Sequence, residues 1–264
     1  NLEVKEDHTY LIPNCFVHNC QDFSVAGNQK GAMWECKDCG HKYNPLTVHY
    51  DKRKYCPNCN SENIIKTRSS LVVEFLRIIK AKKPKWGIYE NVPNITSKQF
   101  LPTFMLFIEE LKEYGYNVYY NILNARKYGI PQNRERLYLV FILRKYDNEK
   151  FLFPSPFYNG IEFKDMLENN VDSKYYLSTK NTNSLFNTVD KNKLEQRKLP
   201  IACASRGRYD KDKKIKQKLE INSYNASNTI TTVQKDNLVI DNIFNDEISE
   251  EDKCFFSYLD TLNS

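Results

Sequence analysis

Residues 115–143 read GYNVYYNILNARKYGIPQNRERLYLVFIL, and this stretch decides how the chain folds. Residues 118–123 and 137–143 are apolar runs rich in β-branched and aromatic side chains, which predicts two strands. The polar turn between them holds a glycine, a proline and three arginines. The stretch is therefore interpreted as two strands on either side of an arginine-rich turn.

Helical and strand patterns alternate upstream of this stretch. Apolar residues recur at helical spacing from Leu71 to Ile79, residues 86–89 are typical of a short strand, and residues 100–114 of a second helix. Helices that alternate with short apolar strands predict an α/β fold with a parallel-type sheet. Past residue 150 the apolar runs become fewer, and Asn, Lys and Ser increase, which predicts a smaller, irregular second domain.

The chain has 264 residues and a net charge of +6, which suits a nucleic-acid partner but does not establish one. No apolar run approaches the roughly 20 residues of a membrane span. The charged start has no signal-peptide pattern and resembles a cut end, so we expect a cytoplasmic protein. We expect four regions: a segment 1–19, a catalytic domain 20–150, a second domain 151–245 and a tail 246–264. A cysteine-rich insert at 34–63 lies within the catalytic domain.

Four of the eight cysteines form two Cys-x-x-Cys pairs, Cys36/Cys39 and Cys56/Cys59. Each pair can present two thiolates to one metal, and four thiolates complete a tetrahedral Zn²⁺ site with no open position. The spacing predicts a structural zinc ribbon; disulfides or free thiols are the alternatives. The insert also holds basic residues that either contact DNA or form a solvated face: Lys37, Lys42, Lys52, Arg53 and Lys54.

Three kinds of chemical group stand where an α/β enzyme places reacting side chains, at strand ends and loops. Glu90 ends a predicted strand, Arg134 and Arg136 precede another, and Cys20 lies in a polar loop. This set suits methylation of carbon 5 of cytosine. Thiolate addition to carbon 6 activates carbon 5, a carboxyl at nitrogen 3 stabilises the charge that develops, and an arginine holds the 2-oxo group. Taken singly, each residue is more often structural.

In their order along the chain, these motifs resemble the DNA cytosine-5 methyltransferases. Cys20-Gln21 resembles motif IV, residues 67–71 motif V, Glu90-Asn91-Val92 motif VI, and residues 115–136 motifs VII and VIII. The resemblance covers residues 20–35 and 66–240, with the zinc ribbon as an insert that most family members lack. It implies a partial Rossmann-like class I methyltransferase sheet and a smaller, irregular target-recognition domain.

The resemblance also implies roles, a donor and a partner. Cys20 would be the nucleophile, Glu90 the nitrogen-3 partner, and Arg134 and Arg136 contacts to the base and active site. Leu71 would lie near the methyl donor, S-adenosylmethionine. The partner would be double-stranded DNA, with the target cytosine flipped out of the helix.

The second domain resembles the family's target-recognition domain at residues 201–208 and 228–233. Thr229 and Ile230 take the place of a usual Thr-Leu. Arg206 and Arg208 could reach base edges or phosphates, and solvation of a loop is the equal alternative.

Residues 1–20 resemble the C-terminal end of an intein. Asn19 before a nucleophilic Cys20 can cyclise and cut the peptide bond, with His8 and His18 as proton carriers. The methyltransferase resemblance begins at Cys20 and lacks the usual preceding proline, which an insertion at this junction explains. A chance His-Asn dipeptide is the alternative.

The chain shows neither the glycine-rich donor loop of the family nor its closing motifs, so we expect an upstream half to complete the enzyme. Until then we expect neither tight donor binding nor methylation. Two other functions stay open: a self-splicing fragment without methylation activity, or a zinc-ribbon DNA-binding module with a decayed catalytic core. The DNA target and the biological role also stay open.

Overall fold

The computed structural model describes residues 33–66, 71–189, 199–209, 212, 214–222, 225–230 and 236–240, together with the backbone of short strands at 3–4, 9–12, 15–18 and 256–258. The chain divides into two units. The first takes in residues 1–123 and 135–154, and the second residues 124–134 and 155–264. Among the helices in the described ranges, none is long and apolar enough to cross a membrane.

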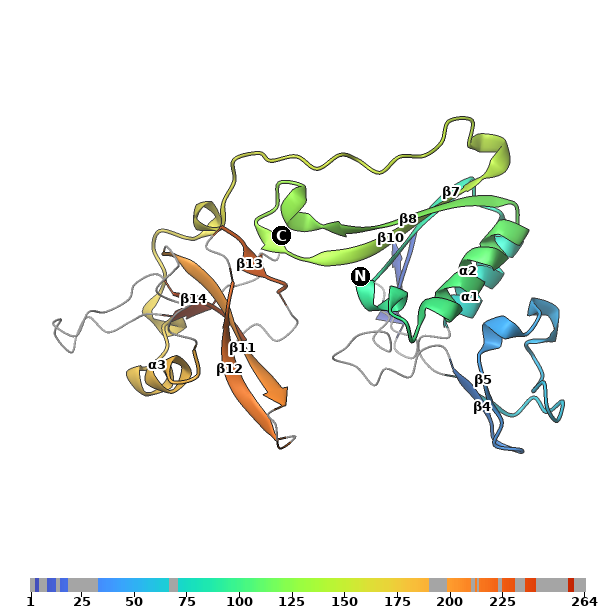
Figure 1. The fold of residues 1–264 in the computed structure, drawn as a ribbon, viewed down its shortest axis with the longest axis horizontal. Helices are drawn as coiled ribbons and strands as arrows, with labels where there is room; N and C mark the ends of the chain where they lie inside the picture. The colour runs from blue at the N-terminus through green and yellow to red at the C-terminus, as the bar shows by residue number, and fades with distance from the viewer. Residues whose placement is uncertain are drawn as a thin grey trace. The chain divides into compact units, whose positions relative to one another are not determined.

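The first unit is organised around a three-stranded sheet (Figure 1). Its strands are β7 (Trp86–Asn91), β10 (Glu135–Leu143) and β8 (Tyr116–Asn124), in the order β7-β10-β8. The strands predicted on either side of the arginine-rich turn are confirmed as β8 and β10. At Gly87 the sheet leaves no room for a side chain, because an added Cβ would lie 2.2 Å from the ring of Phe141.

The prediction of a parallel-type sheet is wrong for the β7–β10 pair. β10 runs antiparallel to β7, with Leu137 opposite Asn91 and Ile142 opposite Trp86. A parallel neighbour needs a long crossover, usually a helix. The chain instead leaves β8, passes through the short 3-10 helix η5 (Ala125–Lys127) and the two-residue strand β9 (Gln132–Asn133), and returns as β10 between β8 and β7.

Two helices of this unit pack with the sheet in one hydrophobic core. Helix α1 (Leu71–Lys82) and helix α2 (Leu101–Glu113) each carry an apolar stripe at helical spacing. Full burial of each large side chain stabilises the fold by roughly 1.5–3 kcal/mol. Gly115, at φ +95°, follows the end of α2 in a conformation that favours glycine. The buried stripes are Val72, Val73, Leu76 and Ile79 on α1, and Phe104, Phe107, Ile108 and Leu111 on α2.

The cysteine-rich insert forms a small antiparallel sheet in the same unit. Its strands are β4 (Trp34–Cys36), β5 (Lys42–Tyr43) and β6 (Ile64–Lys66), in the order β5-β4-β6. Two 3-10 helices, η1 (Pro45–Thr47) and η2 (Tyr50–Lys52), lie between β5 and β6. Buried residues of the insert belong to the same core cluster as α1 and α2. The insert is therefore packed into the unit.

Three short strands precede the insert: β1 (Glu3–Val4), β2 (Thr9–Ile12) and β3 (Cys15–His18). They pair antiparallel, with Thr9 opposite His18.

The second unit contains an antiparallel sheet with a buried core of its own. Its order is β12 (Ile215–Ile221), β11 (Ile201–Tyr209), β14 (Asn237–Ile240), β15 (Phe256–Tyr258). Helix α3 (Thr179–Phe186) belongs to the same unit. Strand β13 (Ser227–Asn228) pairs with β9 in parallel. This part is more regular than the irregular domain that was predicted. Only the first half of β11 is buried, so the hydrophobic pattern that would predict this strand from the sequence is weak.

Candidate active site and metal centre

Glu90 lies next to the end of β7, and strand alternation decides where it points. Tyr89 and Asn91 are buried, whereas the Glu90 side chain is 43% exposed. The Asn91 side chain donates to the Tyr89 hydroxyl (2.6 Å) and accepts from the Val92 N–H (2.7 Å). These two bonds hold the buried side chains on either side of Glu90, whose own carboxylate lies on the partly open face.

Arg136 is the partner of that carboxylate. Its Nε lies 3.1 Å from Glu90 Oε1, and its side chain is 19% exposed. Glu90 pairs directly with Tyr138, so Arg136 is its diagonal neighbour on the same face of the sheet. Arg136 Nη1 also donates to the Glu135 carbonyl at 2.7 Å. The structure thus brings together two of the predicted catalytic residues as a partly open ion pair.

The other predicted catalytic and donor residues have different positions. Arg134 is half-buried in the second unit, where its carbonyl accepts from the Ala125 N–H at 2.9 Å. Leu71 is the half-buried first residue of α1. Cys20, Asn19 and His8 lie outside the described residues, and of His18 only the backbone is described.

The predicted DNA-recognition residues meet in the second unit. Arg206 Nη2 donates to the Thr229 carbonyl at 2.9 Å, and the Thr229 hydroxyl donates to the Asn133 carbonyl at 2.8 Å. Arg206 and Arg208 also face Glu220 of β12. The distance from Arg206 Nε to Glu220 Oε2 is 4.0 Å, and that from Arg208 Nε to Glu220 Oε1 is 2.5 Å. The hydrogen bond to Glu220 raises the pKa of Arg208 above its ordinary value. No motif in the sequence marked Glu220, because only strand pairing places it there.

The four cysteines of the insert converge on one point. Their Sγ atoms all lie within 4.8 Å of one another. Cys36 and Cys59 are 3.5 Å apart and Cys39 and Cys56 are 3.7 Å apart at sulfur, whereas a disulfide would need about 2.05 Å. The disulfide alternative is therefore not what the structure contains. Separations of this size suit four thiolates around one tetrahedral Zn²⁺.

Each Cys-x-x-Cys pair forms the same tight turn. The Gly40 N–H donates to the Cys36 carbonyl and the Asn60 N–H to the Cys56 carbonyl, both at 2.9 Å. Gly40 (φ +69°) and Asn60 (φ +58°) occupy the left-handed region, which glycine and asparagine tolerate best. Two matching turns therefore face each other with their thiols inward.

Two of the four thiols have shifted pKa values, in opposite directions. A hydrogen bond from Asn58 lowers the pKa of Cys39 to about 6. The Ser61 backbone lowers the pKa of Cys59, but the other thiols and burial outweigh it and raise that pKa to about 12. A divalent cation would favour the deprotonated form of these thiols, since thiolates are the form that binds metal.

One predicted DNA-facing residue of the insert is not on the surface. Arg53 is buried and paired with Glu110 of α2, so the expectation that its side chain faces DNA or solvent is wrong. Lys37, Lys42, Lys52 and Lys54 are exposed. Sequence reasoning missed Glu110, which is 57 positions from Arg53.

Comparisons with known proteins agree with the family resemblance. Residues 59–253 match the family described as C-5 cytosine-specific DNA methylase. Type II methyltransferase M2.ScrFI of Lactococcus lactis subsp. cremoris is 38% identical over 64% of this chain and 37% of its own length. Type II methyltransferase M.SsoII of Shigella sonnei is 41% identical over 53% and 35%. Orphan methyltransferase M.SPBetaI of Bacillus phage SPbeta is 28% identical over 63% and 44%.

A crystal structure of a mutant of Spodoptera frugiperda DNMT2 aligns with 47% of this chain and 39% of its own, at 20% identity and a TM-score of 0.39. The chain spans less than half the length of the curated relatives named above. The family match covers more than half of the chain, and it includes Glu90, Arg134 and Arg136. The chain belongs to the C-5 cytosine-specific DNA methylase family.

Proposed function

We propose that this chain is the catalytic and target-recognition part of a DNA cytosine-5 methyltransferase. The observation that carries the proposal is the partly open Glu90–Arg136 pair, 3.1 Å apart at the end of β7, in a member of this family. A carboxylate at a strand end with half of its surface open can accept the edge of a base. The partner is double-stranded DNA with the cytosine flipped out.

In the proposed reaction, the Cys20 thiolate adds to carbon 6 of the cytosine. The carboxyl of Glu90 holds nitrogen 3 through a shared proton, so charge that develops on the ring is neutralised there. Arg136 keeps that carboxyl in place, and Arg134 contacts the base or the active-site chain. S-adenosylmethionine would supply the electrophilic methyl group. After transfer, loss of the proton from carbon 5 expels the thiolate and restores the aromatic ring.

This chain contributes little to the donor site. Leu71 at the start of α1 is its only proposed contact with S-adenosylmethionine, and the glycine-rich loop of the family resemblance is not in the sequence. The enzyme to be tested therefore joins residues 20 onward to the N-terminal part of such a methyltransferase. We expect the chain by itself to be inactive.

Target recognition is proposed for Arg206, Arg208 and Thr229. They stand on β11 and directly after β13; the Thr229 carbonyl accepts from Arg206 at 2.9 Å and Glu220 accepts from Arg208 at 2.5 Å. An arginine fixed in this way loses little further entropy when it meets a guanine edge or a phosphate.

Residues 1–19 are proposed to be the C-terminal segment of an intein, which Asn19 cyclisation releases from Cys20. Support comes from the residues His8, His18, Asn19 and Cys20, and from the hairpin β2–β3 that ends just before the junction. Asn19→Ala should block release of residues 1–19, as measured by mass spectrometry. Release at an unchanged rate would exclude the proposal.

A covalent trap tests the methyltransferase proposal. Fluorine at carbon 5 of cytosine cannot leave as a cation, so the adduct with Cys20 should persist. The completed enzyme would be mixed with S-adenosylmethionine and a mixed-sequence duplex in which 5-fluorocytosine replaces cytosine. We expect a one-to-one adduct on the peptide that contains Cys20, and none with Cys20→Ser. An adduct on another residue, or methylation that persists in Cys20→Ser, would refute the mechanism.

A further inference from the structure

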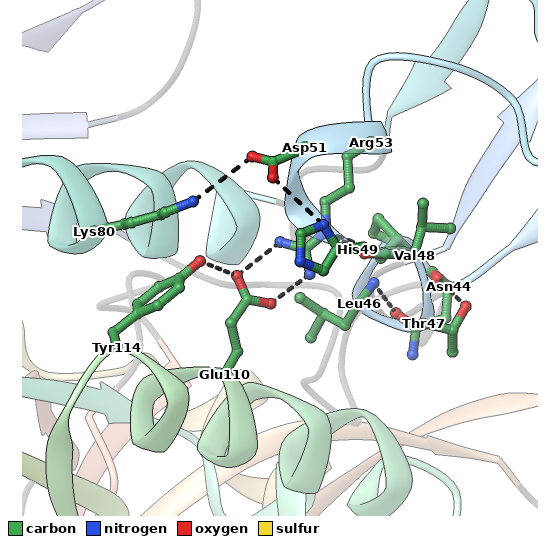
Figure 2. A network of polar contacts seen from close by, with 11 residues as sticks. Asn44, Leu46, Thr47, Val48, His49, Asp51, Arg53, Lys80, Glu110 and Tyr114 are labelled. Carbon is green, nitrogen blue, oxygen red and sulfur yellow. Dashed lines mark hydrogen bonds and ion pairs between the residues drawn. The ribbon is translucent and has the colours of Figure 1, made fainter.

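The insert is fastened to helix α2 by a buried arginine. Both Arg53 and Glu110 have side chains only 7% exposed. Arg53 Nη1 donates to Glu110 Oε1 at 2.9 Å, and Nη2 makes a second, parallel bond to Oε2 (Figure 2). The Tyr114 hydroxyl donates to the same carboxylate. This is a bidentate, desolvated pair, the geometry in which arginine binds carboxylate best.

The same arginine also holds its own loop. Arg53 Nε donates to the carbonyls of Pro45 (2.8 Å) and Val48 (2.9 Å), which belong to η1 and its C-terminal end. Beside it, Asn44 Nδ2 donates to Thr103 Oγ1 of α2 at 2.8 Å. One side chain therefore connects the loop to the helix and also fixes the shape of that loop.

The insert contacts the two helices in different ways. Toward α1 lies a cavity of about 420 Å³ that Val73 and Arg53 help to line, and the contact there is an exposed ion pair between Lys80 and Asp51 at 3.6 Å. Toward α2 the polar contacts are buried. Helix α2 in turn packs against the strand of Glu90, since the ring centroids of Phe107 and Tyr89 lie 5.0 Å apart.

The loop that carries these contacts, residues 40–55, is bounded by Cys39 and Cys56. No disulfide links the four cysteines, so a bound metal is what would tie the ends of the loop together. A metal would therefore hold both ends of the loop that carries Arg53.

We infer that metal binding at Cys36, Cys39, Cys56 and Cys59 stabilises helix α2 through the Arg53–Glu110 pair, so that the insert is a metal-locked brace for the methyltransferase core. The inference goes beyond the proposed reaction and does not depend on it. A structural metal contributes its binding free energy to whatever fold requires the metal.

The test is hydrogen exchange of the full chain, purified with Zn²⁺ and then stripped with a chelator. We expect one Zn²⁺ per chain by elemental analysis. On stripping, we expect faster amide exchange in residues 101–113 and a thermal midpoint lower by roughly 10 °C for this unit. Residues 201–209 of the second unit serve as the internal control and should not change. Exchange that changes only within residues 33–66, or a chain that binds no Zn²⁺, would overturn the inference.

A pair of variants isolates the arginine. Arg53→Met with Glu110→Leu removes both charges and keeps apolar volume, so the double variant should still fold. It should bind one Zn²⁺, yet exchange in residues 101–113 should no longer respond to the chelator. An undiminished response would show that Arg53 does not carry the coupling. Lys37→Ala, which changes an exposed cation of the same insert, is the matched control and should behave like the unaltered chain.

Discussion

Two arginine–glutamate pairs in the same unit have opposite surroundings. Arg53 and Glu110 are each 7% exposed, and their carboxylate also accepts from Tyr114. Arg136 and Glu90 are 19% and 43% exposed, at the open end of a strand. Ion pairs of the same chemistry therefore stand in two environments. The buried carboxylate has its partners inside the protein, whereas the open one is partly accessible to solvent.

The largest difference is expected in stability. Arg53→Met leaves the Glu110 carboxylate buried without its cation, which should lower the free energy of unfolding by about 3–5 kcal/mol. Arg136→Met breaks a pair that water reaches, and should cost less than about 1 kcal/mol. Urea unfolding of both variants measures the contrast. Equal losses would mean that burial does not separate the two pairs.

Activity should show the reverse order. Glu90→Gln in the completed enzyme keeps the shape and removes the charge, so kcat should fall about 10²- to 10³-fold, the usual cost of one electrostatic group at a transition state. Its stability should change by less than about 1 kcal/mol. Methyl transfer to DNA, with unfolding recorded on the same sample, checks both. Glu110→Gln is the control, and should lose stability instead.

A smaller effect is expected at Tyr114. Burial, followed by the hydrogen bond to Glu110, raises the pKa of its hydroxyl. Tyr114→Phe removes one hydrogen bond, worth about 1 kcal/mol near neutral pH. A raised pKa gives stability that is fully present below the unfolded value near 10 and is lost as the pH rises toward the folded value.

The advantage of the unaltered chain over Tyr114→Phe should therefore be constant up to about pH 9 and shrink above about pH 10. Urea midpoints of both chains between pH 7 and pH 11 give this difference directly. An advantage that grows above pH 10 would mean that the tyrosine does not donate to Glu110.

Local patterns in the sequence predicted the groups whose partners are near or whose spacing is diagnostic. Cys36, Cys39, Cys56 and Cys59 were recognised because two Cys-x-x-Cys turns need no other information to form a ligand set. β8 and β10 followed from their apolar runs. Glu90 and Arg136 followed from motif order, and the structure places them 3.1 Å apart.

Tertiary packing decided what the sequence could not. Arg53 stands among lysines in a polar insert, so its sequence neighbours favour a solvated face. In the structure it is buried against Glu110 of α2, which is 57 positions away. Strand β10 runs antiparallel to β7 and lies between β7 and β8, and no local pattern in the sequence specifies that position. Glu220 is brought to Arg206 and Arg208 by the pairing of β11 with β12.

The most direct test of the central claim is methyl transfer per folded molecule, measured on Glu90→Gln and on Arg53→Met of the completed enzyme at a temperature where both are partly or wholly folded. The account predicts that Glu90→Gln is folded but nearly inactive, and that the folded fraction of Arg53→Met transfers methyl groups at close to the rate of the unaltered enzyme. Near-normal transfer by Glu90→Gln, or folded Arg53→Met that is as inactive as Glu90→Gln, would contradict it.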